Sequence, residues 1–91
     1  MKRPDDKELK RLRQELFEQI EGGQISLDEA TRTMRRILGM NRKEYAAKIL
    51  EIGFETLQDV ETGQGNPTLK TLRTIGAPFG LDIGFVRKKG G

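Results

Sequence analysis

The spacing of apolar residues is the feature that most constrains how this chain can fold. Leucine, isoleucine and other apolar residues recur at three- and four-residue intervals, and glycines or capping residues separate the runs. This period is typical of amphipathic helices that bury one face. The sequence therefore predicts an all-α domain of short helices, and its 91 residues are enough for one domain with a small core.

An N-terminal helix is predicted over residues 5–21, and the pair Gly22-Gly23 ends it. Its inward stripe consists of Leu9, Leu12, Leu16 and Ile20. Residues 1–21 also carry six basic and six acidic side chains. Because the two signs are mixed, we interpret the outer face, which includes the following basic residues, as solvated rather than as a DNA-binding arm: Lys7, Lys10, Arg11 and Arg13.

Two capping boxes predict where the next helices begin, at Ser26-Leu27-Asp28-Glu29 and at Asn41-Arg42-Lys43-Glu44. The first helix should end near Gly39, and its inward residues are Leu27, Ala30, Thr31, Met34, Ile37 and Leu38. The second helix is shorter, and Gly53 breaks its pattern. Its inward residues are Tyr45, Ala46, Ile49 and Leu50. We expect Tyr45 in the core with its hydroxyl at the rim.

Two further short helices follow. Leu57 and Val60 face inward on the first of them, and Gly63 lies just beyond its end. Either Asn66 or Thr68 caps the last helix, whose inner face is formed by Leu69, Leu72, Ile75 and Phe79. Pro78 has no amide hydrogen, so this helix should kink or end there.

The C-terminal segment alternates, with Leu81, Ile83 and Phe85 on one face, which is the pattern of a short β-strand. No other segment predicts a strand, so its simplest partner is the same strand of a second copy. The alternative is a frayed tail that packs one or two side chains on the last helix. Residues 88–91 are expected to be disordered.

Composition excludes several classes of function. The chain has no cysteine and no histidine, which excludes disulfides and catalytic dyads of serine or cysteine with histidine and leaves almost no route to a structural zinc site. The only serine, Ser26, serves as a helix cap. No run approaches the roughly 20 apolar residues of a membrane span. We therefore expect a cytoplasmic, non-enzymatic protein with no metal and no cofactor.

Three segments resemble the lambda-repressor/Cro-like (XRE-type) helix-turn-helix family: Met34 to Ala46, Thr56 to Gly63, and Asn66 to Leu72. The most specific pieces are Glu61-Thr62-Gly63 and Asn66-Pro67-Thr68-Leu69. The C-terminal segment looks like that of members with an added strand, including some antitoxins. The resemblance implies a helix-turn-helix DNA-binding domain over residues 24–80. With the N-terminal helix (1–23) and the C-terminal strand and tail (81–91) predicted above, the expected fold is an all-α helix-turn-helix bundle with an extra helix and a short strand that dimerises the protein.

In this family the third helix lies in the major groove. The resemblance therefore assigns base reading to Phe54, Glu55, Thr56, Gln58 and Asp59. Gln58 can pair with adenine, Glu55 or Asp59 can accept from cytosine N4, and Thr56 can contact a base or a thymine methyl group. Phe54 is equally interpretable as a base contact or as a core residue.

The resemblance also implies phosphate contacts and a structural ion pair. The phosphate contacts fall on Arg42, Lys43, Asn66, Thr68 and Lys70. The alternative for Arg42 and Lys43 is that they are ordinary solvated charges. Arg35 and Glu61 match an ion pair that ties the first helix of the family motif to the end of the third.

The chain departs from the family pattern in two places. Leu50 stands where the family usually has a glycine, and Gly53 comes later, so the turn is expected to be one residue longer and the base-reading register can shift by one. Glu55 and Asp59 also bring negative charge toward a polyanion, where neutralisation of phosphates normally dominates affinity. Weak binding per monomer favours a dimer on two half-sites about 34–36 Å apart.

These features predict a sequence-specific regulator of transcription that binds double-stranded DNA as a homodimer. A repressor is the leading interpretation, with an autoregulating antitoxin that also binds a toxin as a subclass. The alternative is a protein–protein interaction module, such as an anti-activator, on a helix-turn-helix scaffold. The acidic third helix and the unusual N-terminal helix favour that alternative.

Overall fold

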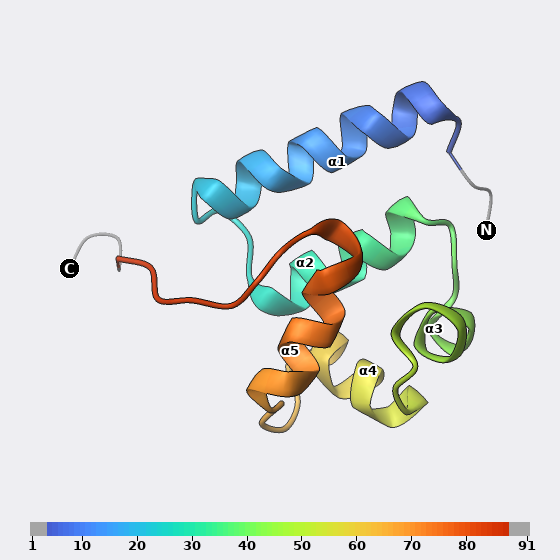
Figure 1. The fold of residues 1–91 in the computed structure, drawn as a ribbon, viewed down its shortest axis with the longest axis vertical. Helices are drawn as coiled ribbons and strands as arrows, with labels where there is room; N and C mark the ends of the chain where they lie inside the picture. The colour runs from blue at the N-terminus through green and yellow to red at the C-terminus, as the bar shows by residue number, and fades with distance from the viewer. Residues whose placement is uncertain (1–3, 88–91) are drawn as a thin grey trace.

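Figure 1 shows the computed structural model, which describes residues 4–87. Its helices follow the pattern of the apolar residues. The elements are α1 (Asp6–Glu21), α2 (Leu27–Ile37), α3 (Arg42–Glu44) continued by the π-helix η1 (Tyr45–Leu50), α4 (Phe54–Thr62), α5 (Leu69–Gly76) and the 3-10 turn η2 (Ala77–Phe79). The predicted all-α class is confirmed. None of the helices within residues 4–87 has the length and apolar character that crossing a bilayer requires.

Side-chain caps fix where four of the helices begin. The side chains of Asp5, Ser26, Asn41 and Thr68 each accept a hydrogen bond from the backbone amide three residues later. Thr68 rather than Asn66 therefore caps α5. Only the box at Asn41 is complete, because the Glu29 carboxylate accepts from the Ser26 hydroxyl and not from its backbone amide.

The core lies where α1 and α2 meet α4, α5 and the turn η2. Its buried side chains are Leu16, Ala30, Met34, Ile37, Tyr45, Ala46, Leu50, Leu57, Val60, Ile75 and Phe79. Two residues that were expected to face inward are exposed, Leu27 and Leu69. Each is the first residue of its helix. α1 joins the core through Leu16, which is 1% exposed.

The helix between α3 and α4 is wider than an α-helix. Residues Tyr45–Leu50 form a π-helix, and the Ile52 amide closes it by donating to the Ala46 carbonyl at 3.0 Å. A π-helical turn takes up an additional residue without breaking the helix. The longer turn stays a prediction, and the π-helix is a place where this chain can accommodate the additional residue. Glu51 then adopts the left-handed conformation, with φ of 53°, which is unusual outside glycine.

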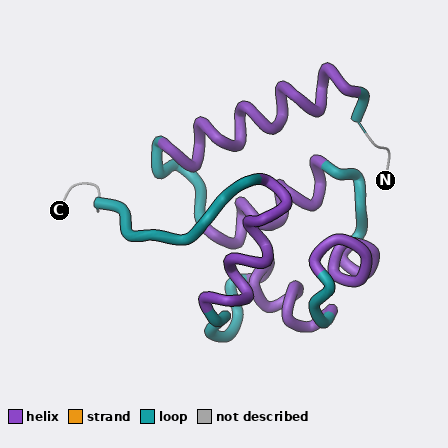
Figure 2. Tube along the Cα trace, in the orientation of Figure 1, coloured by secondary structure: helices purple, strands orange, loops and turns teal. Residues whose placement is uncertain are grey.

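The C-terminal segment has no regular secondary structure in the single chain. Figure 2 shows residues 81–87 as loop, and Figure 1 shows them leaving the helical body to one side. The predicted strand is thus not present among residues 4–87, since a strand forms only beside another strand. Leu81 and Ile83 are half-buried, as in the alternative of a packed tail. The expectation for residues 88–91 lies outside the described residues.

Candidate nucleic-acid interface

α4 has one anchored side and one free side. Leu57 is 0% and Val60 4% exposed, and both pack into the core. The five residues assigned to base reading are all exposed: Phe54, Glu55, Thr56, Gln58 and Asp59. Phe54 keeps 45% of its surface accessible, which sets it apart from the buried core. The anchored residues therefore turn the polar positions of α4 toward solvent.

A buried ion-pair network fixes the C-terminal end of α4. The Glu61 side chain is 0% exposed, and its two oxygens accept from Arg35 Nε at 2.8 Å and Nη2 at 2.9 Å. Arg35 Nη1 also donates to the Met40 carbonyl at 3.0 Å, and Arg32 donates to the backbone carbonyl of Glu61. A bidentate arginine–carboxylate pair fixes the relative orientation of the two side chains and also attracts them to each other. The network therefore sets the angle between α2 and α4.

Arg42, which was assigned to phosphate binding, also takes part in this network. Its Nε donates to Glu61 Oε1 at 2.9 Å, and its side chain is 31% exposed. Its terminal nitrogens make no hydrogen bond within residues 4–87 and remain accessible to a ligand. The sequence reasoning missed the contact because nothing in the linear pattern relates the first residue of α3 to a glutamate 19 positions later.

The charge state of Glu61 follows from these contacts. Burial alone raises the pKa of a carboxyl group, because it disfavours the charged form. The hydrogen bonds from Arg35 and Arg42 outweigh that effect and hold the pKa of Glu61 below its ordinary value. Glu61 is therefore ionised, and its carboxylate holds Arg35 and Arg42 in place by accepting their hydrogen bonds.

Tyr45 lies entirely inside the protein, with its side chain 0% exposed. The expectation that its hydroxyl reaches the rim is wrong, and this hydroxyl has no hydrogen-bond partner among the described residues. Burial, together with the nearby negative charge of Glu61, raises the pKa of Tyr45 to about 12. The hydroxyl therefore stays neutral and is a local cost to stability.

The fold brings two groups of predicted residues together. Thr56 and Asp59 of α4 line a hollow of about 290 Å³ with Asn66 and Thr68, which precede α5. The Thr68 hydroxyl is engaged as the cap of α5 and also donates to Thr71 Oγ1 at 3.1 Å. Positions assigned to bases and positions assigned to phosphates thus share one concave surface between α4 and α5.

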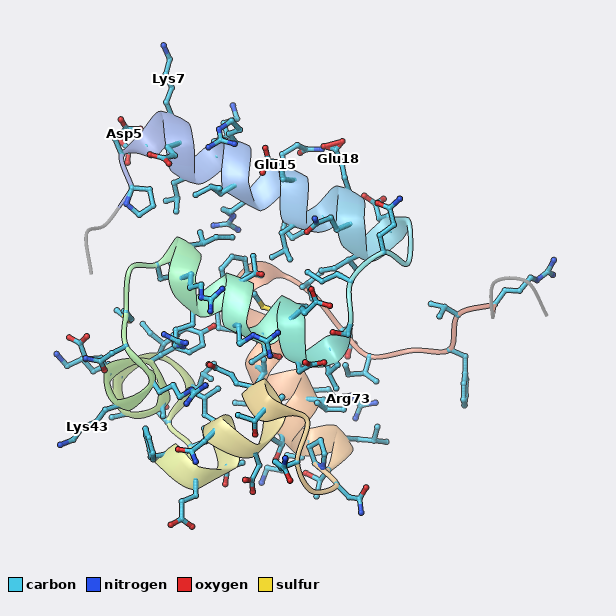
Figure 3. All side chains as sticks on the ribbon, turned by 180° about the vertical axis from the view of Figure 1, so that it is seen from behind. Asp5, Lys7, Glu15, Glu18, Lys43 and Arg73 are labelled. Carbon is cyan, nitrogen blue, oxygen red and sulfur yellow. The ribbon has the colours of Figure 1, made fainter. Side chains whose placement is uncertain are left out.

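The lysines assigned to phosphates are exposed. Lys43 on α3 points away from the body in Figure 3, and Lys70 lies in the first turn of α5. They belong to the helices that precede and follow α4 in the chain. Within residues 4–87, no cluster of acidic side chains has the arrangement of a metal site.

Comparison with known proteins adds one finding. A family model described as helix-turn-helix matches residues 32–86, which is more than half of the chain. The matched part begins within α2, continues through α3, η1, α4 and α5, and leaves α1 outside. No curated protein and no solved structure matches the chain. The resemblance drawn from the sequence motifs is confirmed by the family match.

Proposed function

Because the chain belongs to the helix-turn-helix family of DNA-binding regulators, we propose that it is a sequence-specific repressor that binds double-stranded DNA as a dimer. The observation that carries the proposal is the two-sided character of α4. Leu57 and Val60 anchor it, Glu61 clamps its end, and five neighbouring residues face solvent. A recognition helix needs this combination of rigid support and free polar side chains.

The base contacts in this proposal follow from chemistry. Gln58 offers a donor and an acceptor, which match the N7 and N6 positions of adenine. Glu55 and Asp59 carry only acceptors and make no ion pair within residues 4–87, so they suit the N4 donor of cytosine. Thr56 and Phe54 add contacts to thymine methyl groups. Sequence specificity then comes from α4 alone.

Phosphate contacts would set the register of the protein on the duplex. Lys43 on α3 and Lys70 on α5 supply positive charge, and Asn66 supplies a polar side chain before α5. The Thr68 hydroxyl can join them by exchanging its hydrogen bond to Thr71 Oγ1 for one to a phosphate oxygen. The free terminal nitrogens of Arg42 add a third cation. These groups offset the negative charge that Glu55 and Asp59 bring to the interface.

Affinity from one short helix with two carboxylates is low, so the proposal includes a dimer on two half-sites. The dimer forms through the C-terminal segment 81–91, with Leu81, Ile83 and Phe85 at the contact. Residues 24–80 form the DNA-binding unit, and residues 1–23 form the added helix. An autoregulating antitoxin is the finer form of this function, and it adds a toxin as a protein partner.

A mobility-shift titration with duplex DNA at several salt concentrations tests the proposal. The DNA is taken from upstream of the protein's own gene, with a random duplex as control. We expect the preferred duplex to bind more tightly, and the logarithm of the association constant to fall linearly with the logarithm of salt concentration. Equal affinity for both duplexes would contradict sequence-specific recognition.

One observation favours a second function. Glu55 and Asp59 are exposed on the same face of α4 without a basic partner, which suits a basic protein surface as well as cytosine. The protein would then be an interaction module on a helix-turn-helix scaffold. The same titration distinguishes the two functions, because absent or salt-independent DNA binding favours the protein partner.

A further inference from the structure

The C-terminal arm, residues 81–87, carries two large apolar side chains that are almost fully exposed. Phe85 is 107% and Val86 91% exposed. Among its backbone amides, Leu81 donates to the Gly76 carbonyl at 3.0 Å and Ile83 to its neighbour Asp82, and the rest have no partner within residues 4–87. Neighbouring apolar side chains this exposed, beside unpaired backbone groups, mark a surface that another chain covers.

An apolar hollow lies beside the base of this arm. We call it the α1 hollow, and it is lined by Phe17, Ile20, Glu21, Phe79 and Leu81. Its volume is about 400 Å³, and Phe17, Ile20 and Leu81 are only half-buried around it. α1 forms one wall, so the hollow exists because this chain adds a helix that lies outside the helix-turn-helix match.

The α1 hollow and the arm carry opposite charges, since Glu21 lines the hollow and Arg87 lies at the end of the arm. Residues 14–31, which run from α1 into α2, contain five acidic residues and no lysine or arginine: Glu15, Glu18, Glu21, Asp28 and Glu29. Glu15 and Asp28 are already paired with Arg11 and Arg32, and Arg13 lies over the ring of Phe79 on the other wall of the hollow. Glu18 and Glu21 make no ion pair within residues 4–87, and Figure 3 shows Glu18 projecting from α1. The end of the chain, residues 83–91, contains three basic residues and no acidic one: Arg87, Lys88 and Lys89.

We propose that the α1 hollow of each copy receives the C-terminal arm of a second copy. The two arms pair antiparallel with Ile83 opposite Ile83, which puts Phe85 of one copy opposite Leu81 of the other. Directly opposite residues share a face, so all six apolar side chains lie together. Because Leu81 lines the hollow, this register brings the incoming Phe85 to its mouth.

The same register explains the charges. Beyond Leu81 the incoming chain continues along Gly80 and Phe79, so Arg87 reaches the acidic end of α1 at Glu21. A two-fold axis repeats every contact, and no free edge remains for a third copy. The inference rests on the dimer in the proposed function but needs none of its DNA contacts.

Sedimentation equilibrium of the full chain without DNA tests the inference. We expect the wild-type protein to be a dimer and Phe85→Ser to weaken dimerisation at least about 100-fold, since each dimer loses two buried phenylalanines. Leu69→Ser is the matched control, because Leu69 is 59% exposed, begins α5 and does not line the α1 hollow. It should leave the dimer intact. A monomeric wild-type protein, or a dimeric Phe85→Ser variant, would overturn the proposal.

A charge exchange tests whether the arm binds in trans. Glu21→Arg and Arg87→Glu should each weaken self-association, because each variant sets like charges against one another. An equimolar mixture should recover a dimer, since each arm then meets a hollow of opposite charge. A mixture that stays monomeric would overturn the contact between Arg87 and Glu21. Phe85→Ser should still bind a single half-site weakly, which separates failure of the dimer from failure of DNA recognition.

Discussion

Replacing Glu61 with glutamine removes one negative charge from a site that is 0% exposed and holds two guanidinium groups. Arg35 is then a cation with a side chain only 10% exposed and no anion beside it. Arg42, at 31% exposed, recovers part of its hydration. Breaking one partner of a buried ion pair costs about 3–5 kcal/mol, and the amide oxygen of glutamine keeps one acceptor. We therefore expect Glu61→Gln to lower the free energy of unfolding by about 3 kcal/mol.

Urea denaturation followed by circular dichroism measures this loss, and the pH dependence identifies its source. The pKa of Glu61 in the folded state lies below its ordinary value of 4.5. The contribution of its charge is therefore complete above the unfolded pKa and is lost as the pH falls through the folded pKa. The difference in the free energy of unfolding between wild type and Glu61→Gln should be constant near neutral pH and should become smaller in acid.

Two results would refute this reasoning. One is a loss below about 1 kcal/mol at neutral pH, which is the size expected of an exposed pair. The other is a difference in the free energy of unfolding between wild type and Glu61→Gln that stays the same when the pH is lowered. The double variant Arg35→Met with Glu61→Leu is the informative control, because replacing both partners with apolar residues is often neutral. It should be more stable than Glu61→Gln.

Four other predictions concern single positions. Tyr45→Phe removes a buried hydroxyl without a partner and should raise the free energy of unfolding by about 1 kcal/mol, measured by thermal melting; a loss would mean that the hydroxyl is bonded. Glu51→Gly relieves a left-handed φ of 53° and should stabilise by about 0.5–1 kcal/mol in the same assay, whereas no gain would argue against strain. Gln58→Ala should cost about 1–3 kcal/mol on the preferred duplex and little on a random one, with exposed Gln19→Ala as control, and equal losses would remove Gln58 from base reading. Gly76→Ala places a methyl group 3.0 Å from the Leu81 carbonyl oxygen and should destabilise by about 1–3 kcal/mol, so an unchanged melting temperature would contradict close packing of the arm's base.

Local signals in the sequence were sufficient for most of the fold. The boundaries of α1, α2, α4 and α5 follow from glycines, from caps such as Thr68 and from the apolar period, all of which act within a few residues. Leu27 and Leu69 were misplaced because periodicity alone does not show how completely the neighbouring elements cover the first residue of a helix. The expected C-terminal strand needs a second chain, which a single folded copy does not provide.

The candidate site likewise has positions that the sequence predicts and contacts that it does not. The outward position of Gln58 and Thr56 follows from the inward position of Leu57, because both belong to one short helix. The contact between Arg42 and Glu61 depends on how α3 and α4 cross, and the buried hydroxyl of Tyr45 depends on how completely its neighbours close over it. Both features arise from tertiary packing, and no regular spacing of residues in the sequence indicates them.

The π-helix η1 has a consequence for how this chain is aligned with its relatives. Positions counted forward from the Asn41 cap and positions counted backward from Leu57 disagree by one residue when a relative has an ordinary α-helix there. Leu57 is the better position from which to count, because its burial in the core determines which way the neighbouring side chains of α4 point. An ungapped comparison started at Asn41 would give the chemistry of Gln58 to Leu57, a residue that no base can reach.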